Sequence, residues 1–553
     1  MKKAFWSIIF LFLLALISFA QLASDPNDKL YTWISIWEEK GYVSNLPLLR
    51  PYPIQLLKEI LLRVVEVGTS EEKLRAEKYL KTLDVSVGDP IPDRSLPGVV
   101  SFSVENSFYT KFDSLREDLM VYAIIQGRLG DIFSFSGKGG WGGMVQTEGF
   151  YPPEWLQITN EAETGGGKAE AGDLTFWSEN LGVGTITIGT PELYFQAGLN
   201  RASFGPFFEN GAVIGPQAPA AGHFSFTYLS PWVRISSVML ILHPTQYEKP
   251  DSELAGDPDY FAIGSISRSW ENYLIVHSYT FTPASWFELG IVQTVLLGHS
   301  ANPVFALPFV HTFFAQMIYG DDNSSLVGLF ARIRLPLDLQ LKFMLYVDDF
   351  SANTFLGLDG SSHLFSLDSS QNKAALQTGL VWTPHFDFIW RLSLDYLIVT
   401  PYTYTHCANY NNKLSYTHKG VGVGTILQPN SDQLTLSSFL QPASWLDVLF
   451  TVRYARHGNA SEAFSGYGGD GSYYDDGYMD GEALFICPML FLNQEVLEHV
   501  LQVGLDLEFD FRLGGSEFEL GIGYLFEFVK NKALEKDRDE INHFLKIFFR
   551  YLI

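Results

Sequence analysis

The chain has 553 residues, of which 47% are hydrophobic, 15% aromatic and 18% charged, and its mean hydropathy is +0.07. This composition is too apolar for an ordinary soluble protein and too polar for a bundle of membrane-spanning helices. It suits a large β-barrel, whose strands turn one face to lipid and the other to polar groups. The formal net charge of −25 argues against nucleic acid or anionic lipid as the main partner.

The first twenty residues have the pattern of a secretory signal peptide. Two lysines precede an apolar run that ends at Ile17, and small residues follow at Ser18 and Ala20. We expect cleavage after Ala20, so that residues 1–20 are removed; the alternative is a retained anchor helix of marginal length. No other segment approaches the roughly 18 apolar residues of a spanning helix. An exported chain without such helices indicates an outer-membrane β-barrel.

Residues 21–95 predict three short amphipathic helices. Asp28 is placed to cap the first, Pro53 suits the first position of the second, and Thr69 with Glu72 forms a capping box for the third. A bundle this small is not stable unless it docks on something. Because the N-terminus of a barrel normally emerges on that side, we place the bundle in the periplasm, joined by a proline-containing run to a barrel of residues 96–553.

The hairpin of residues 501–512 and 517–528 shows the strand pattern best. Apolar and polar side chains alternate over about eleven residues in each strand, about the length that a tilted strand needs to cross a bilayer. Similar patterns are centred near residues 104, 123, 133, 183, 196, 226, 238, 275, 290, 330, 343, 379, 393, 437, 450, 505, 523 and 547. We predict an all-β fold, a transmembrane antiparallel β-barrel of about 18 strands (16–18) with a small N-terminal helical bundle.

Five prolines stand between successive pairs of predicted strands. They are Pro231, Pro283, Pro336, Pro384 and Pro442. Proline presets φ for a tight turn and cannot donate to a ladder, so we predict short hairpin turns there, on the periplasmic rim. The long connections are then extracellular, roughly 138–172, 244–258, 298–324, 350–373, 400–432 and 456–498. Within the third, the apolar residues 301–319 could fold inward as a plug or lie along the rim.

The alternation assigns charged residues of both signs to the lumen. They are Arg332, Arg334, Lys342, Arg391, Asp395, Asp447, Arg453, Asp506, Glu508, Asp510, Arg512, Glu517, Glu519, Lys546 and Arg550. We expect an ion-paired interior rather than a selectivity ring of one sign. The charges either only satisfy one another or line a solute path.

Aromatic and acidic residues gather in two of the predicted loops. Aromatic faces stack on sugar rings and carboxylates accept hydrogen bonds from hydroxyls, so these loops could bind a glycan. The candidates are Trp141, Tyr151 and Trp155 in the first loop and Tyr467, Asp470, Tyr473, Tyr474, Asp475, Asp476 and Tyr478 in the last. The alternatives are a calcium ion, although the spacing of the acids does not match an EF-hand, and a flexible loop without a ligand.

No catalytic motif is present: GxSxG, HExxH, CxxC and P-loop patterns are all missing from the sequence. His406 near serines, and His457 with Asp470 and Ser461, are coincidences expected among 12 histidines. We therefore predict no enzyme, cofactor or metal. Whether Cys407 and Cys487 form a disulfide stays open, because the sequence does not show their proximity.

Three patches of the chain resemble the Wzi capsule-assembly family. Residues 195–226 resemble its signature of a strand ending in Gly-Arg, a Gly-Pro-Gly turn and an apolar strand, with the arginine displaced to Arg201 and Phe207 in place of the second glycine. Residues 41–53 and the helix after them look like the family's periplasmic module. Residues 346–350 are similar to a late strand that ends in paired acids.

The resemblance implies an outer-membrane barrel of about 18 strands with a periplasmic helical bundle and a lectin-like role. We expect a monomer that anchors or organises capsule-like surface polysaccharide through its extracellular loops. Its other partners would be outer-membrane lipid and the barrel-assembly machinery, which reads an aromatic-rich final strand such as residues 544–553; nucleic acid is not expected. The alternative is a diffusion porin or solute-uptake channel, and a purely structural or adhesive surface protein is a third class.

Overall fold

The computed structural model describes residues 25–83, 99–111, 114–147, 150, 168–243, 271–298, 301–319, 323–349, 373–386, 388–405, 407–409, 412–419, 421–459, 491–513 and 516–552. Its helices are α2 (Lys29–Glu39), α3 (Ile54–Val67), α4 (Ser70–Leu83) and α7 (Thr312–Tyr319), with the short 3-10 helix η4 (Lys532–Leu534). Among these described helices, none has the length and apolar character to cross a membrane.

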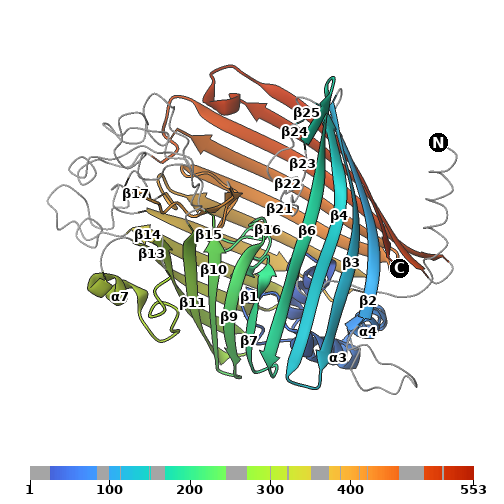
Figure 1. Ribbon diagram of the computed structural model, residues 1–553, viewed down its shortest axis with the longest axis vertical. Coiled ribbons are helices and arrows are strands. Elements are labelled where there is room, and N and C mark those ends of the chain that lie inside the picture. Colours follow the sequence, from blue (N-terminus) through green and yellow to red (C-terminus); the bar gives the residue numbers. More distant parts are fainter. Residues whose placement is uncertain are drawn as a thin grey trace.

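Eighteen antiparallel strands close into a barrel (Figure 1). They are β2 (Val99–Lys111), β3 (Ser114–Leu129), β4 (Phe133–Thr147), β6 (Leu174–Gly189), β7 (Leu193–Asn200), β9 (Ala221–Leu229), β10 (Val233–Leu242), β11 (Asn272–Ala284), β12 (Phe287–Gly298), β13 (Asn323–Leu335), β14 (Leu339–Asp349), β15 (Lys373–Trp382), β16 (Ile389–Val399), β21 (Ser431–Ala443), β22 (Leu446–Gly458), β23 (Leu497–Leu513), β24 (Ser516–Lys530) and β25 (Glu540–Leu552). Pairing of β2 with both β3 and β25 closes the ring. Each predicted centre falls within one of these strands, so the predicted fold class is confirmed.

Shorter strands extend the barrel or pair inside it. β5 (Lys168–Ala171) lengthens the sheet beside β6. β1 (Leu49–Arg50) pairs with β8 (Ser203–Phe204), β17 (Cys407–Asn409) with β18 (Asn412–Lys413), and β19 (Thr417–His418) with β20 (Val421–Gly422). The β1–β8 pair joins the N-terminal segment to the connection between β7 and β9.

The outer face of the barrel is apolar and exposed. Ile188 on β6, Phe224 on β9 and Ile291 on β12 each keep about half of their surface open, whereas Thr187, His223 and Val292 beside them point inward and are buried. An exposed apolar face on alternate residues of closed, antiparallel strands is what lipid contact requires. The chain therefore has the fold of an outer-membrane β-barrel.

The five prolines predicted to mark turns lie at one rim, but they occupy two kinds of position. Pro231 and Pro336 occupy the turns β9–β10 and β13–β14, and Pro384 lies in the β15–β16 connection. Pro283 and Pro442 instead lie one residue before the ends of β11 and β21, where the register with the next strand shifts. A proline cannot donate to the ladder, so it is tolerated at such a bulge.

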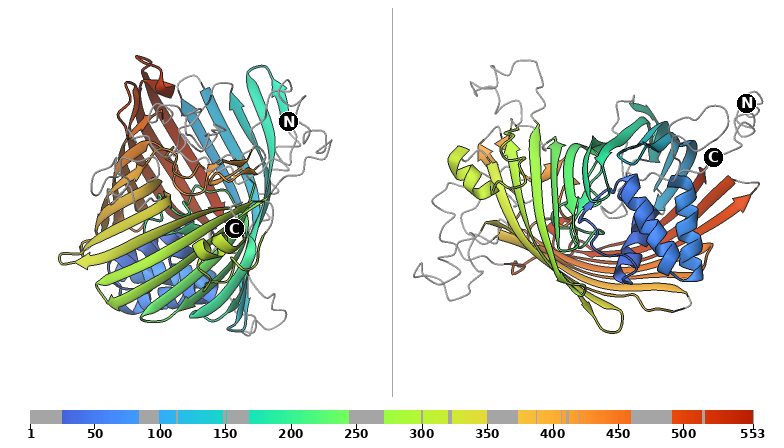
Figure 2. Two further views of the ribbon diagram at one scale, coloured as in Figure 1. Left: turned by 90° about the vertical axis from the view of Figure 1, so that its left-hand side faces the viewer. Right: turned by 90° about the horizontal axis from the view of Figure 1, so that it is seen from below.

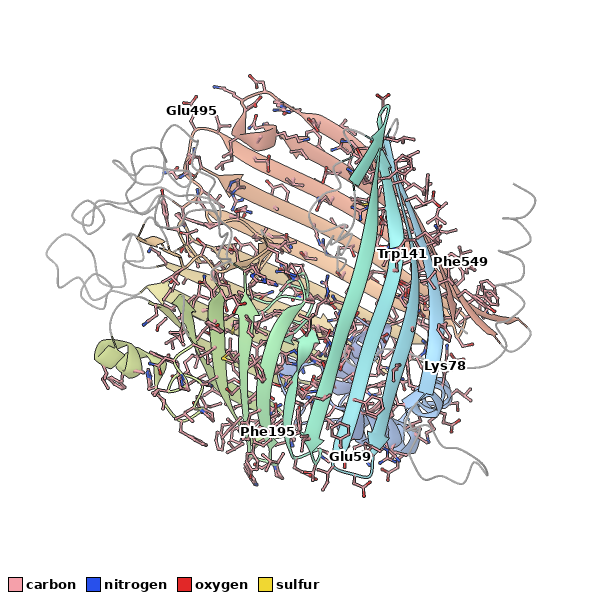
Figure 3. The ribbon with its side chains drawn as sticks, in the orientation of Figure 1. Glu59, Lys78, Trp141, Phe195, Glu495 and Phe549 are labelled. Atoms are coloured by element: carbon pink, nitrogen blue, oxygen red, sulfur yellow. The ribbon has the colours of Figure 1, made fainter. Side chains whose placement is uncertain are left out.

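The helical bundle, formed by α2, α3 and α4, lies within the mouth of the barrel at the short-turn rim (Figure 2, right). The predicted caps are confirmed. Asp28 accepts a 2.9 Å hydrogen bond from the backbone of Leu30, and Thr69 and Glu72 make the reciprocal capping box that begins α4. Glu59 of α3 and Glu495, which precedes β23, lie at opposite ends of the molecule (Figure 3). The assignment of the short-turn rim to the periplasm stays a prediction.

The apolar residues 301–319 do not enter the lumen. Phe305 and Ala315 pack on Ile275, Val295 and Leu297, which point outward from β11 and β12. This segment, which ends in α7, therefore lies on the outer wall of the barrel (Figure 1).

Candidate functional site: a lumen closed at two levels

The helical bundle forms the first closure and is joined to the wall by ion pairs. At the start of α2, the Lys29 ammonium lies 2.5 Å from the carboxylate of Asp447 on β22. The same group lies 3.0 Å from Glu508 and 3.7 Å from Asp510, both on β23. Three acids around one ammonium would repel one another without it, so Lys29 fixes this end of the bundle to the wall.

The end of α2 carries negative charge and pairs with cations on β13, β14 and β16. The Glu39 carboxylate accepts hydrogen bonds from Arg391 at 2.8 Å and from Lys342 at 2.9 Å. Its neighbour Glu38 pairs with Arg332 at 2.9 Å. Burial disfavours ionisation of Glu39, but the charges of Arg391 and Lys342 outweigh it and lower the pKa of Glu39 to about 2. This carboxylate is therefore ionised and held by two cations.

Apolar and neutral polar contacts complete the ring around the bundle. Trp33 of α2 packs edge-on against Phe439 of β21, with ring centroids 5.3 Å apart. Gln55 of α3 accepts a 2.7 Å hydrogen bond from Ser134 on β4. Tyr194 of β7 and Ile389 of β16 belong to the same buried cluster as the helices. Because β4 and β7 lie across the ring from β16 and β21, the bundle spans the lumen.

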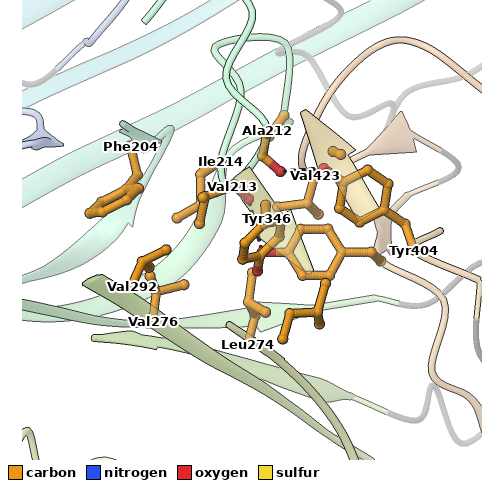
Figure 4. Packing of buried hydrophobic residues seen from close by; sticks show 14 of the residues in the cluster. Phe204, Ala212, Val213, Ile214, Leu274, Val276, Val292, Tyr346, Tyr404 and Val423 are labelled. Carbon is orange, nitrogen blue, oxygen red and sulfur yellow. Dashed lines mark hydrogen bonds between the residues drawn. The ribbon is translucent and has the colours of Figure 1, made fainter. Parts of the chain in front are cut away.

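A second closure comes from two connections that fold inward: residues 201–220, between β7 and β9, and the described residues of 402–427, between β16 and β21. Together they pack on the inner face of β10–β16 (Figure 4). Tyr404 and Tyr416 donate hydrogen bonds of 2.7 and 2.8 Å to the carbonyls of Ala212 and Val213. Tyr346 on β14 donates to Thr294 on β12 at 2.8 Å beneath them. The apolar inner wall at this level is therefore buried rather than open to water.

The two inward connections fit closely at Gly215. Its backbone N–H donates to the carbonyl of Val423 at 2.8 Å, and the Gln217 amide donates to the carbonyl of Gly424 at 2.6 Å. A β-carbon at Gly215 would approach the Gln217 side chain to 2.1 Å and the Gly424 carbonyl to 2.2 Å. Only glycine permits this approach.

The two closures form one connected unit. Arg391 donates to Glu39 of the bundle and also, at 2.9 Å, to Glu209 of the inward connection 201–220. The β1–β8 pair lies beside it, and the backbone of Gly205 donates to the carbonyl of Leu48 at 3.1 Å. The Arg50 guanidinium lies 3.4 Å from the ring centroid of Phe208. Arg391 therefore connects the two closures directly.

The predicted lumen residues fall into three groups in the structure. Arg332, Arg334, Lys342, Arg391, Asp447, Glu508 and Asp510 contact the bundle. Glu519 and Arg550 pair with each other at 2.9 Å, and Arg550 pairs with Glu105 at 3.0 Å. Asp395, Arg453, Asp506 and Lys546 occupy inward positions of their strands. The side chains of Arg512 and Glu517 lie outside the described part.

The predicted glycan-binding residues are mostly outside the described residues. This applies to Tyr151, Trp155, Tyr467, Asp470, Tyr473, Tyr474, Asp475, Asp476 and Tyr478, and to Cys487 and the Cys407 side chain, so their predictions stay untested.

The prediction that Trp141 lies in a loop is wrong. Trp141 lies within β4, opposite Val121, and 65% of its side chain is exposed on the outer wall (Figure 3). The glycines around it suggested a loop. In the structure they make room for side chains of β3: a β-carbon at Gly140 would lie 2.2 Å from the Tyr122 ring.

Sequence reasoning missed the partners that the bundle and the inward connections supply. Lys29, Glu38, Glu39 and Glu209 were not among the predicted site residues. The sequence of α2 held one signal of these partners: Glu38 and Glu39 directly follow Trp37 on a helix that is too apolar to be stable without packing against another surface. Within the described ranges, no group of three or more His, Cys, Asp or Glu residues is placed to hold a metal ion.

Comparison with known proteins finds the same architecture. No family model and no curated protein matches the sequence. Among solved structures, Wzi of Escherichia coli aligns over 96% of this chain and 99% of its own, with a TM-score of 0.57 and 12% identity. The chain shares the fold of Wzi. At 12% identity this similarity concerns the fold alone, and at that level the resemblance noted in the sequence is confirmed.

Wzi is described as a carbohydrate-binding β-barrel and an outer-membrane protein involved in group 1 capsule assembly. Two Pseudomonas aeruginosa proteins align less well. OccK10 (OpdN) covers 83% of this chain and 99% of its own at 8% identity and a TM-score of 0.42. The outer membrane protein OprD covers 85% and 97% at 9% identity and a TM-score of 0.40. Similarities this weak carry no functional argument.

Proposed function

We propose that this barrel anchors or organises a surface polysaccharide through its extracellular side and does not conduct solutes. The observation that carries the proposal is the double closure of the lumen. The bundle contacts β4 and β7 on one side of the ring and β13, β14, β16 and β21–β23 on the other, and the two inward connections bury the apolar inner face of β10–β16. A barrel whose interior is occupied by packed and ion-paired residues has its free surface at the rims.

Two further points support a glycan as the ligand. The barrel has the fold of Wzi, a carbohydrate-binding protein. The long connection of residues 459–490 is rich in tyrosine, glycine and aspartate, which suit stacking on sugar rings and hydrogen bonding to hydroxyls. Outer-membrane lipid and the barrel-assembly machinery are further proposed partners. Catalysis is no part of the proposal.

Binding of polysaccharide to the purified, complete chain tests the proposal. Isolated surface polysaccharide is passed over the barrel immobilised in detergent, and surface plasmon resonance reports the association. We expect binding that falls when residues 466–477 are deleted and stays unchanged in Trp232→Ala, which alters an exposed aromatic at the opposite rim. No binding by the complete chain contradicts the proposal. Unchanged binding after the deletion removes that loop from it.

The porin alternative makes the opposite prediction for ion flow. The charged walls of β22–β25 and β2–β4 would suit a hydrated path if the closures moved aside. Steady conductance of the unmodified chain in a planar bilayer would favour this alternative.

A further inference from the structure

Residues 301–319 form a segment on the outside of the barrel, here called the strap. Ile275, Val295 and Leu297 are buried beneath it, each no more than 5% exposed. The residues that alternate with them, such as Leu274 and Leu296, belong to the luminal cluster on the other face of the same strands. The strap therefore covers part of the surface that faces lipid elsewhere on the barrel.

Two polar side chains that point outward hold the strap. His277 on β11 and Gln293 on β12 are direct partners across the ladder, and they are 0% and 4% exposed. The His277 Nε2–H donates to the carbonyl of Phe305 at 2.8 Å. The Gln293 amide donates to the carbonyl of Val310 at 2.9 Å and accepts from the backbone of Thr312 at 3.3 Å.

These two positions explain how irregular backbone can lie at membrane depth. An imidazole and an amide that face lipid without partners are costly, and so are unpaired backbone groups of a non-helical segment. Here the His277 and Gln293 side chains form hydrogen bonds with backbone groups of the strap. The arrangement fastens the strap to the wall through the Nε2 of His277 and the amide of Gln293, while the Nδ1 of His277 is buried without a partner among the described residues.

The exposed side chains of the strap are mostly apolar, and His311 is the polar one among those that the structure describes. Leu307, Phe309, Phe314 and Ile318 are 55%, 79%, 61% and 76% exposed, and the sequence from 301 to 319 contains no Asp, Glu, Lys or Arg. Past the edge of the strap, Ile291 on β12 continues this surface as part of the exposed apolar band and is 51% exposed. The two surfaces are therefore continuous.

We propose that the strap is inserted in the membrane, with its outer surface covered by the acyl chains of the surrounding lipid. Continuity with the lipid-facing band supports lipid as the occupant. A protein partner would be expected to meet a polar rim around an apolar centre, and the strap offers no charged group for one. This inference is independent of the proposed glycan function.

Quenching by lipid tests the insertion. The complete chain, with Cys407 and Cys487 changed to serine, carries an environment-sensitive fluorophore at Phe309→Cys or Ile318→Cys in phosphatidylcholine vesicles with brominated acyl chains. We expect quenching by bromine as strong as at Ile291→Cys and no quenching by aqueous iodide. Lys536→Cys, on an exposed connection, should show the reverse.

Two results would overturn the insertion. Labels on the strap that behave like the label at position 536 would place it in water. Labels shielded from both quenchers, with shielding that is lost when the protein is diluted in the vesicles, would show that a second copy covers the strap. Quenching at position 291 shows independently that the barrel itself is in the bilayer.

The fastening role has its own test. Leucine suits an outward position, so Gln293→Leu should leave the barrel folded while Val310 and Thr312 lose their partner. A spin label at position 309 should then shift toward the mobile spectral component, whereas Ile291→Leu should leave its spectrum unchanged. An unchanged spectrum in Gln293→Leu would show that this residue does not hold the strap.

Discussion

Replacement of Glu39 by glutamine tests the bundle closure most sharply. The substitution keeps the size of the side chain but leaves Arg391 and Lys342 without the carboxylate that both contact. The pKa of Glu39 is lowered from 4.5 to about 2. At roughly 1.4 kcal/mol per pKa unit, the ionised carboxylate stabilises the docked bundle by about 3 kcal/mol. Loss of one partner from a buried ion pair costs a similar amount, about 3–5 kcal/mol.

Hydrogen exchange of the α2 amides measures this loss. A change of about 3 kcal/mol corresponds to a roughly hundredfold rise in the population of the open state, and exchange through local opening rises in proportion. We expect peptides from residues 29–39 of Glu39→Gln to lose about two orders of magnitude of protection. Glu66→Gln is the matched control, because Glu66 pairs with Arg63 on the exposed surface of the same bundle and should change protection little. Equal protection in the two variants would refute the reasoning.

Three further predictions concern pH and the link between the closures. The pKa of Glu39 is depressed in the folded protein, so its contribution to docking of the bundle is complete above pH 4.5 and is lost as the pH falls toward about 2. Spin labels at Glu59→Cys and Trp232→Cys should then move apart. A constant separation of the labels down to pH 2 would contradict this. Burial raises the pKa of Asp28 to about 6, although the hydrogen bond from Leu30 partly offsets this effect. Asp28 therefore favours docking of the bundle more as the pH falls from about 6 toward 3.8. Asp28→Asn should abolish the change in label separation over this pH range. Arg391→Met should speed hydrogen exchange both in residues 29–39 and in residues 203–214, whereas Lys342→Met should speed it only in residues 29–39. Equal exchange patterns in the two variants would show that Arg391 does not join the closures.

The wall of the barrel was predictable because its signal is local. An alternation of apolar and polar residues reports which face of a strand is which, and strands this long indicate a membrane barrel. The caps of α2 and α4 were predictable for the same reason, since Asp28 and the Thr69–Glu72 pair act within a few residues. Gly140 shows the limit: glycines that clear space for an aromatic on the next strand look like loop residues in a sequence.

The interior was not predictable because its contacts are distant in the sequence. Lys29 meets Asp447 and Glu39 meets Arg391, and alternation assigns both wall residues to the lumen without indicating what they meet there. The inward fold of residues 201–220 had no periodic signal, since its backbone pairs with Leu49 and Val423 rather than with a neighbouring strand of the barrel. The strap was recognised as unusual, but its side of the wall depends on His277 and Gln293, which the alternation places among lipid-facing residues.

Recording from planar bilayers tests the closed lumen most directly. The complete chain, inserted in a membrane, should show no steady conductance, because the bundle and the two inward connections occupy the lumen together. A variant that lacks residues 25–83 and also carries Gly215→Val, which disturbs the second closure, serves as the control and should conduct. Steady conductance of open-pore size from the unmodified chain would contradict the closed lumen and, with it, the proposal that the protein works from its surface.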